Sequence, residues 1–412
     1  MSHTQAILDF AAAPHVLPDA VRADAMRLLA DTLAVMAAGA ATPEAARLRQ
    51  MSPDLAFFNG FAIHCLEWDA VHEPAVVHAL SVVTAALLAA SHRAGGSDPE
   101  AFLTALSVGV DIASGLGLAA TGPMRFFRPA TAGVVGAALA VARLEGLNQP
   151  TGLGFADVLG FAYSFAGGTM QAHVEGSIAL PLQIGRAAQA AVQAVDLVKA
   201  GFIAPHDVLE GPFGYSNLIE RLDLTRYTAT LGQIWRISEV SIKPFPSGRA
   251  SHGALGVLQA LRHNELANVE LRDVMSIVLQ APPLIHRLVG RRYRPGADPS
   301  INRLCLGFLA PLMLRDGMID PRLEQTDALL AGRIDVVVDN NPDENAMTPQ
   351  RLVVTLKDGS TIERQIDANL GSPDAPMSPE QLAAKYELCR TLAPHSDPRI
   401  FDDPLSYATD PR

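Results

Sequence analysis

Residues Phe57 to Ala90 read FFNGFAIHCLEWDAVHEPAVVHALSVVTAALLAA, and we expect the rest of the chain to be organised around this stretch. Its second half, Leu80–Ala90, is an almost unbroken run of small apolar residues, which predicts a buried helix. Just before that run, five acidic and imidazole side chains lie close together in sequence: His64, Glu67, Asp69, His72 and His78.

Two interpretations of this polar group stay open. Imidazoles and carboxylates at the mouth of a buried helix could carry out proton transfer. The same side chains could instead cap the helix and pair with one another. Clustered titratable groups indicate function only in a fraction of cases, so their spacing does not decide between the two.

Length and composition favour a helical protein of two domains. A chain of 412 residues is too long for one simple core. Hydrophobic residues make up 49% and charged residues 18%, which excludes a disordered chain. Abundant alanine with only 6% aromatic residues favours closely packed helices. The net charge of −11, with scattered Lys and Arg, gives no nucleic-acid footprint, although an anionic small substrate stays possible.

The cysteines and the apolar runs predict a soluble cytoplasmic protein. Cys65, Cys305 and Cys389 are odd in number and far apart, so we expect neither a disulfide framework nor a metal site. The first ten residues lack the basic and apolar regions of a signal peptide. The longest apolar runs, such as Ala75–Ala90 and Ala130–Ala142, are shorter than a membrane-spanning helix.

The first half of the chain reads as an all-α bundle. Asp98-Pro99 and Leu17-Pro18 are typical helix starts. No stretch before about residue 221 has a convincing strand pattern. The expected helices cover Thr4–Phe10, Pro18–Ala38, Leu80–Ala90, Ala101–Leu118, Ala130–Leu144, Phe155–Ala166 and Ile184–Ala200.

The sequence pattern changes after Trp235, where short β-branched runs appear between helical stretches. This change predicts a smaller α+β domain. The Asp358-Gly359 pair between two β-branched runs is a hairpin signal. Ser378-Pro379-Glu380 begins a last helix that returns to the first domain, and the tail after Pro394 reads as irregular. The expected strands are Ile237–Ile242, Val274–Leu279, Ile334–Val338, Arg351–Leu356 and Thr361–Ile366, and the expected helices are Ser251–Arg262, Ala328–Leu330 and Glu380–Leu392. The predicted domains are residues 1–238 (helical), 239–370 (α+β) and 371–412 (helix and tail).

Six segments in order resemble the MmgE/PrpD superfamily, which includes 2-methylcitrate dehydratase, cis-aconitate decarboxylase and iminodisuccinate epimerase. They are NGFAIHCLEWDAVHEPAVVHA, FRPATAGVVGAALAVARLEGL, GSIALPLQIGRAAQAA, AGFIAPHDVLEGPFG, IKPFPSGRASHGA and APMSPEQLAAKYE. The resemblance implies a large helical domain with a smaller lid domain, a site between them, and a homodimer. It also implies cofactor-free proton transfer on a small carboxylic acid.

The resemblance assigns site residues one by one. Asp69 matches the first Asp of the family's Asp-Asp-Thr group, His78 its downstream His, and Lys243 the Lys before Pro-Phe-Pro. His252 matches the His of that last segment and is taken with Arg128 and His72 as substrate-binding. Several positions depart from the family pattern: Val71 for Thr, Arg128 for His, Leu180 for Lys, Gln183 for His, and Phe308 for Tyr.

The chemistry gives these residues provisional roles. Removing a proton beside a carboxylate builds a doubly charged species, which fixed cations stabilise, so we expect a positively charged pocket. Lys243 would supply one cation and Arg128, as a bidentate carboxylate clamp, another. His78 is the expected acid or base, and Asp69 would orient it or take the proton itself. Each also has a structural alternative; Arg128, for example, could pair with Asp111 or Glu145.

Three functions remain open after this reading. The first is a lyase, either a dehydratase or a decarboxylase, acting on a small di- or tricarboxylic acid. The second is an isomerase or epimerase of a small carboxylic acid. The third is a non-catalytic member that binds a small acid or only pairs with other subunits. For the catalytic functions, replacing His78 or Lys243 with alanine is expected to abolish turnover with little change in melting temperature, and Arg128→Lys to weaken substrate binding.

Overall fold

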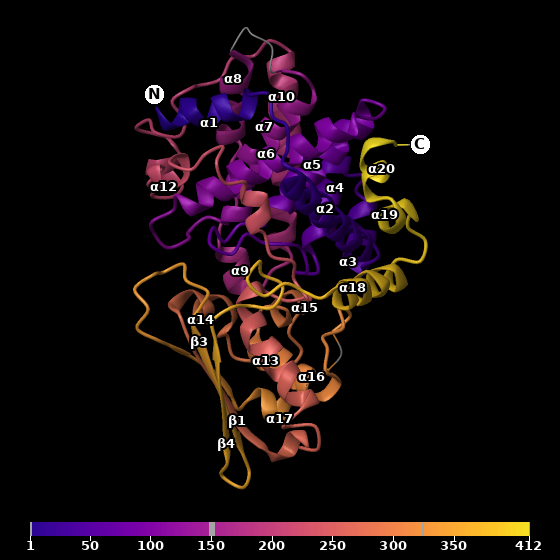
Figure 1. Ribbon diagram of the computed structural model, residues 1–412, viewed down its shortest axis with the longest axis vertical. Helices are drawn as coiled ribbons and strands as arrows, with labels where there is room; N and C mark the ends of the chain where they lie inside the picture. The colour runs from indigo at the N-terminus through magenta and orange to yellow at the C-terminus, as the bar shows by residue number, and fades with distance from the viewer. Residues whose placement is uncertain (1, 148–152, 324, 412) are drawn as a thin grey trace.

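The computed structural model describes residues 2–147, 153–323 and 325–411, which form two parts stacked along the long axis (Figure 1). The upper part, here called the helical body, contains α1–α12 and the C-terminal helices α18–α20. Their bounds are α1 His3–Ala12, α2 Asp19–Ala40, α3 Pro43–Arg49, α4 Leu55–His64, α5 Ala79–Arg93, α6 Pro99–Leu118, α7 Arg128–Leu144, α8 Leu153–Ser164, α9 Gln171–Glu175, α10 Ala179–Lys199, α11 Tyr215–Leu218, α12 Thr225–Thr228, α18 Pro379–Leu392, α19 Arg399–Asp402 and α20 Pro404–Thr409.

The lower part, here called the α+β part, runs from α13 to β4 and holds a mixed four-stranded sheet. The strand order is β2-β1-β3-β4, with β2 parallel to β1 and the other neighbours antiparallel. Its elements are α13 His252–His263, β1 Val274–Ala281, α14 Pro283–Val289, α15 Pro299–Asn302, α16 Leu306–Asp316, α17 Ala328–Ala331, β2 Ile334–Val338, β3 Gln350–Leu356 and β4 Thr361–Ile366. Helices α13 and α16 pack together, and their apolar residues share one core with β1 and β3.

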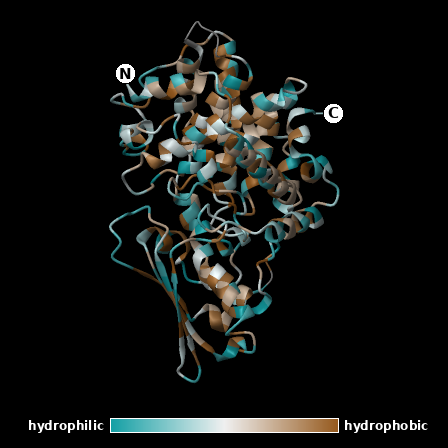
Figure 2. Ribbon diagram, viewed as in Figure 1, coloured by the Kyte–Doolittle hydropathy of each residue, from teal (hydrophilic) through white to brown (hydrophobic). Residues whose placement is uncertain are grey.

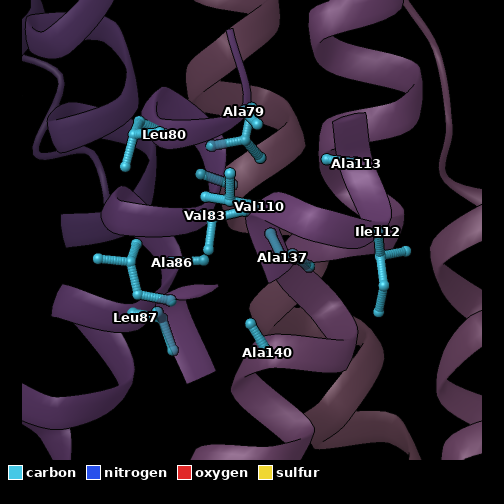
Figure 3. Close-up of a cluster of buried hydrophobic side chains, with 14 of the residues drawn as sticks. Ala79, Leu80, Val83, Ala86, Leu87, Val110, Ile112, Ala113, Ala137 and Ala140 are labelled. Atoms are coloured by element: carbon cyan, nitrogen blue, oxygen red, sulfur yellow. The ribbon is translucent and has the colours of Figure 1, made fainter. Parts of the chain in front are cut away.

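The core of the helical body is built from small side chains, as the alanine-rich sequence predicts. Helices α5, α6 and α7 contact one another through alanine, valine and leucine (Figure 3). A methyl group at Gly136 of α7 would lie 2.2 Å from the carbonyl oxygen of Gly109 in α6. The two backbones therefore approach more closely than any larger residue at Gly136 would allow. The hydrophobic residues of Figure 2 accordingly gather in the middle of this part.

By length and apolar composition alone α6 could cross a membrane, and α2 with α3 would count as a second, bent span. The two apolar runs named from the sequence lie in α5 and α7, of 15 and 17 residues, and neither is among these candidates. Of the apolar window in α6, 89% is buried inside the protein, as in the core helix of a soluble protein.

The mostly α class and the expected long helices are confirmed, as are the β3–β4 hairpin and the helix starts at Asp98 and Ser378. Helix α18 packs against α2, where the Lys385 ammonium lies 2.6 Å from the Asp31 carboxylate. The exact domain boundaries stay a prediction.

Three local predictions were wrong or incomplete. Residues Arg236–Glu239 form a 3₁₀ helix rather than a strand, because Ile237 is buried in the body core while Glu239 pairs with Arg236 and His72. The tail contains α19 and α20, whose Ile400 and Ala408 also join that core. Helix α4 was missed, although Asp54 caps it by accepting a hydrogen bond from the Phe57 amide.

Candidate active site

A small cavity lies where the helical body meets the α+β part. Its volume is about 60 Å³, counted as the space that the centre of a water molecule can occupy. Its walls come from the stretch between α4 and α5, the start of α7, the α9 region, and the segments around residues 249, 288, 304 and 347. The lining residues are His64, Glu67, Val71, Glu73, Val76, His78, Met124, Phe127, Pro129, Met170, His173, Leu180, Gly248, Arg249, Ala250, Leu288, Leu304 and Met347.

Backbone strain is concentrated in this wall. Four non-glycine residues of the described chain have positive φ, and two of them line the cavity: Glu67 and Val76, both at φ 53°. A β-branched residue such as Val76 rarely adopts this conformation, which costs on the order of 1–3 kcal/mol. Strained residues persist where the surrounding structure forces them, and such places are often functional sites.

Asp69 lies at the centre of the polar group. It is fully buried and joins two imidazoles, because one of its oxygens lies 2.9 Å from Nδ1 of both His64 and His78. The Ser81 hydroxyl, one turn into α5, donates to the same oxygen. The two rings meet edge to face with centroids 4.8 Å apart. His64 ends α4 and His78 immediately precedes α5, so two helix ends fix these side chains. Together with Glu67 we call His64, Asp69 and His78 the row.

Lys243 anchors the row from the segment between the two parts of the molecule. Its fully buried ammonium donates to the Glu67 carbonyl oxygen at 2.9 Å and to the Glu67 carboxylate at 3.3 Å. It also lies 3.8 Å from the Asp69 carboxylate. Lys243 and His78 therefore share Asp69 as a common neighbour, as the predicted site requires.

The two imidazoles have opposite protonation preferences. Burial lowers the pKa of His64, but the carboxylates of Asp69 and Glu67 outweigh burial and raise it overall. Burial also lowers the pKa of His78, and there Lys243 and His64 add to burial, so the net shift is downward. His64 therefore holds a proton more readily than His78, whose neutral Nε2 has no hydrogen-bond partner among the described residues.

Both carboxylates of the row stay ionised. Burial opposes ionisation of Asp69, yet His64, His78 and Lys243 hold its pKa well below the usual range. The pKa of Glu67 is lowered in the same way, against burial, by His64 and Lys243. A carboxylate held ionised between two imidazoles favours the orienting role over that of a base, the two roles between which the sequence left Asp69 open.

A second network closes the cavity from the connection to α13. The Arg249 guanidinium donates to the Glu73 carboxylate at 2.5 Å, and Asn369 donates to the same carboxylate at 2.7 Å. Arg249 and Glu73 both line the cavity. Counting the row as well, three cationic groups face three carboxylates: Lys243, Arg249 and His64 against Glu67, Asp69 and Glu73. The expected excess of positive charge is therefore not found among the described residues.

The clamp role expected for Arg128 is not supported. The Arg128 guanidinium is buried and donates to the Glu220 carboxylate through both Nε, at 2.9 Å, and Nη2. Its Nη1 donates to the Ala75 carbonyl oxygen at 2.7 Å. The guanidinium thus links the strained loop at Ala75 to Glu220, which follows α11, and its acidic partner is neither Asp111 nor Glu145.

The two other expected binding residues also point to protein partners. His72 is fully buried, and its Nε2 lies 2.9 Å from the Glu239 carboxylate. His252 is fully buried between the Ser247 carbonyl oxygen and Arg249. Neither residue lines the cavity. Among the positions that depart from the family pattern, Val71 and Leu180 line the cavity, whereas Gln183 and Phe308 do not.

Five polar cavity residues received no role from the sequence: His64, Glu67, Glu73, His173 and Arg249. His64 belongs to the quoted stretch, but its position opposite Asp69 depends on helix α4, which the sequence did not reveal. His173 is buried, and burial together with Arg291 lowers its pKa to about 4, so it is a second neutral imidazole at the cavity. Arg249 follows Lys243 by six residues, and no local pattern indicates that it turns inward.

Side-chain atoms of His64, Asp69 and His78 that could serve as metal ligands lie within 4.8 Å of one another. Zinc accepts such a donor set. Here the Nδ1 atoms and carboxylate oxygens are already joined by hydrogen bonds, and the Lys243 ammonium lies 3.8 Å from Asp69. A divalent cation would displace these bonds beside a fixed positive charge, so the residues do not fit a resident metal.

Replacing Lys243 with methionine is expected to destabilise the protein by about 3–5 kcal/mol, because it leaves buried Glu67 and Asp69 without their cation. This revises the expectation of an unchanged melting temperature for Lys243 variants. Denaturant unfolding provides the measurement. The control is Lys357→Met, which removes an exposed ammonium 3.7 Å from Asp273. Equal stabilities of the two variants would contradict the assigned burial.

Two family models and several curated relatives match most of the chain. Residues 50–224 match the MmgE/PrpD N-terminal domain, and residues 245–400 match the MmgE/PrpD C-terminal domain. Human cis-aconitate decarboxylase is 27% identical over 358 residues, which cover 80% of this chain and 71% of the relative. The mouse enzyme is 26% identical over 81% of this chain and 72% of its own length. The cis-aconitate decarboxylase-like protein oryM of Aspergillus oryzae is 25% identical over 86% and 79%, respectively.

Proposed function

The chain belongs to the MmgE/PrpD family, and from this membership we propose that it is a lyase that removes CO2 from a small carboxylic acid. The similarity to proteins named cis-aconitate decarboxylase supports lyase chemistry on a small acid. It also makes loss of CO2 the first choice over loss of water.

One observation carries the proposal: His78 faces the cavity with a free Nε2, while its Nδ1 is held 2.9 Å from the buried Asp69 carboxylate. A carboxylate at Nδ1 fixes the ring orientation and stabilises the imidazolium form. His78 Nε2 is thus placed to exchange one proton with a bound molecule. The neighbouring His64 is buried with its Nε2 closed off from the cavity, so it contributes charge rather than a proton.

The reaction uses the row as follows. The bond between a carbon of the acid and its leaving carboxylate breaks, CO2 departs, and the electron pair delocalises onto the remaining carboxyl-bearing skeleton. The new C–H bond takes its proton from protonated His78 Nε2. Binding of an anion next to His78 raises the pKa of the ring, so proton and substrate are taken up together. Lys243 and protonated His64 provide fixed positive charge near the developing anion.

The cavity favours an acid with few carboxylates. Its charges are balanced, and Leu180 stands where the family pattern has a lysine. Much of the remaining wall is apolar, with Phe127, Met170, Leu288 and Met347. A carboxylate of the substrate that is buried in the cavity needs a cation to pair with. Burying a third carboxylate here would therefore cost binding free energy. We therefore propose a dicarboxylic rather than a tricarboxylic substrate.

A second candidate is an isomerase or epimerase of a small acid. The observation that favours it is His173, a second buried imidazole of lowered pKa in the same cavity, contributed by α9. Neutral His173 could remove a proton from a carbon, and His78, once protonated, could deliver a proton to that carbon from the other side. Dehydration remains a variant of the lyase proposal, since it also begins with proton transfer beside a carboxylate.

The experiment is a panel of small unsaturated and hydroxylated mono-, di- and tricarboxylic acids, each labelled with ¹³C at its carboxylates. Release of ¹³C-bicarbonate from a dicarboxylic acid, seen by NMR, is the expected result. Water loss would give a conjugated acid with all its carboxylates retained, and epimerisation would change only optical rotation. If no acid on the panel reacts, the lyase proposal fails and the non-catalytic alternative gains support.

The dependence of kcat/KM on pH is expected to show whether His78 acts as an acid or as a base. Burial, Lys243 and His64 lower the pKa of His78 below its ordinary value of 6.5. If free His78 must gain a proton to act as the acid, kcat/KM falls about tenfold per pH unit above that pKa. We expect this falling limb between pH 6 and 8, measured by initial rates. A kcat/KM that rises with pH and then levels would make His78 a base and favour dehydration or epimerisation.

A further inference from the structure

Arg303 is a buried cation without an acidic partner among the residues that the structure describes. It follows α15, and only 7% of its surface is exposed. Its Nη2 donates to the Pro321 carbonyl oxygen at 2.5 Å. Neither Nε nor Nη1 has a hydrogen-bond partner among residues 2–147, 153–323 and 325–411, and no carboxylate of these residues lies within 4.0 Å.

The other buried lysines and arginines show which partner a buried cation in this protein usually has. Every other buried lysine or arginine in the described chain has a carboxylate within 4.0 Å: Arg128 with Glu220, Arg236 with Glu239, Lys243 with Glu67, Arg249 with Glu73, and Lys385 with Asp31. A buried charge without a counter-ion is strongly destabilising, because it has lost its hydration without gaining an ion pair. Burial accordingly lowers the pKa of Arg303, and the acids around it do not offset this.

A cavity separate from the candidate active site lies beside Arg303. The space open to the centre of a water-sized sphere is about 460 Å³, larger than that of the active-site cavity. The end of α2, the start of α3, α15 and the end of α18 contribute to its wall. Much of this wall is apolar and includes Ala38, Pro43, Leu66, Ile178 and Leu392.

We propose that this cavity binds a monocarboxylate with an apolar body, whose carboxylate pairs with Arg303. The Nε of Arg303 is fully buried and its Nη2 donates to Pro321, so Nη1 is the group left to donate to a carboxylate in the cavity. Glu44, Asp298 and a second arginine, Arg322, line the same cavity, so its two cations face two carboxylates and a singly charged anion is favoured over a multiply charged one. The apolar wall then accommodates a hydrocarbon body. This site needs no assumption about the lyase reaction, because it shares no lining residue with the active-site cavity.

The test uses octanoate as the probe and follows binding by calorimetry and melting temperature. We expect one octanoate per chain, with a rise in melting temperature that octan-1-ol and inorganic phosphate do not produce. Arg303→Met keeps the apolar stem and removes the charge. It should abolish the octanoate response while leaving the ligand-free melting temperature equal or higher, since it removes an unpaired buried charge. His78→Asn should bind octanoate as the wild type does.

A second variant keeps the guanidinium and fills the cavity. Ala41 is an exposed residue at the end of α2 that lines the cavity, so Ala41→Phe should weaken octanoate binding at least tenfold without unfolding the chain. Octanoate binding that survives in Arg303→Met would overturn the proposal. An equal response to octan-1-ol, a response to phosphate alone, or unchanged affinity in Ala41→Phe would do the same.

Discussion

Replacing His78 with asparagine lowers kcat by about 10²–10⁴-fold while the melting temperature changes little. The imidazole is the one group of the row whose free nitrogen faces the cavity, so proton exchange stops when it is removed. Asparagine still offers an amide N–H to Asp69, which keeps the buried carboxylate hydrogen-bonded. Steady-state kinetics on the acid identified by the panel, together with thermal unfolding, measure both effects.

The matched control is His92→Asn. His92 lies near the opposite end of helix α5, where its Nε2 contacts the Tyr407 carbonyl oxygen far from the cavity. It should keep wild-type kcat. A His78→Asn enzyme with wild-type kcat would refute the role of His78, whereas equal losses in both variants would indicate a general effect on α5.

Replacing Asp69 with asparagine should cost both activity and stability. The neutral amide removes one of the two carboxylates that His64 and Lys243 share and leaves them Glu67, 3.3 Å from each, so we expect a loss of stability of up to about 3–5 kcal/mol. It also lets the His78 ring turn and removes the charge that stabilises its protonated form. We therefore expect kcat to fall about 10²–10⁴-fold as well, in line with the loss of an acid or base group.

Asp111→Asn is the control for this variant. Asp111 is also fully buried, but burial raises its pKa to about 6, and it accepts hydrogen bonds from Tyr227 and the Arg236 amide instead of facing cations. Its replacement should leave kcat unchanged and lower stability less than Asp69→Asn does. Comparable losses of stability in the two variants, with full activity in both, would mean that Asp69 is only one more buried polar residue.

Much of the fold could be predicted because it depends on local patterns. The apolar runs of α5, α6 and α7 are continuous enough to indicate buried helices, and Asp358-Gly359 marks the β3–β4 turn. The wrong strand at Ile237–Ile242 shows the limit of this reasoning. A short run of β-branched residues predicts that their side chains are buried. Whether the backbone forms a strand depends on the part of the protein against which those side chains pack.

The candidate site was only partly predictable for the same reason. His78 and Asp69 are nine residues apart, so the sequence could bring them together. The contacts between Lys243 and Glu67 span 176 residues, and those between Arg128 and Glu220 span 92. Arg128 looked like a free cation because its counter-charge lies in a segment with no recognisable motif. Charge balance in a cavity is a property of long-range pairing, which spacing in the sequence does not reveal.

The most direct test of the central claim is the position of deuterium in the product. The wild-type enzyme and His78→Asn would each be incubated in D2O with the reactive acid, and the product examined by proton and deuterium NMR. The proposed mechanism predicts one deuterium at the carbon that receives the proton, formed by the wild type at least a hundredfold faster than by the variant. Equal rates of deuterium incorporation by the two proteins would show that His78 does not carry the proton.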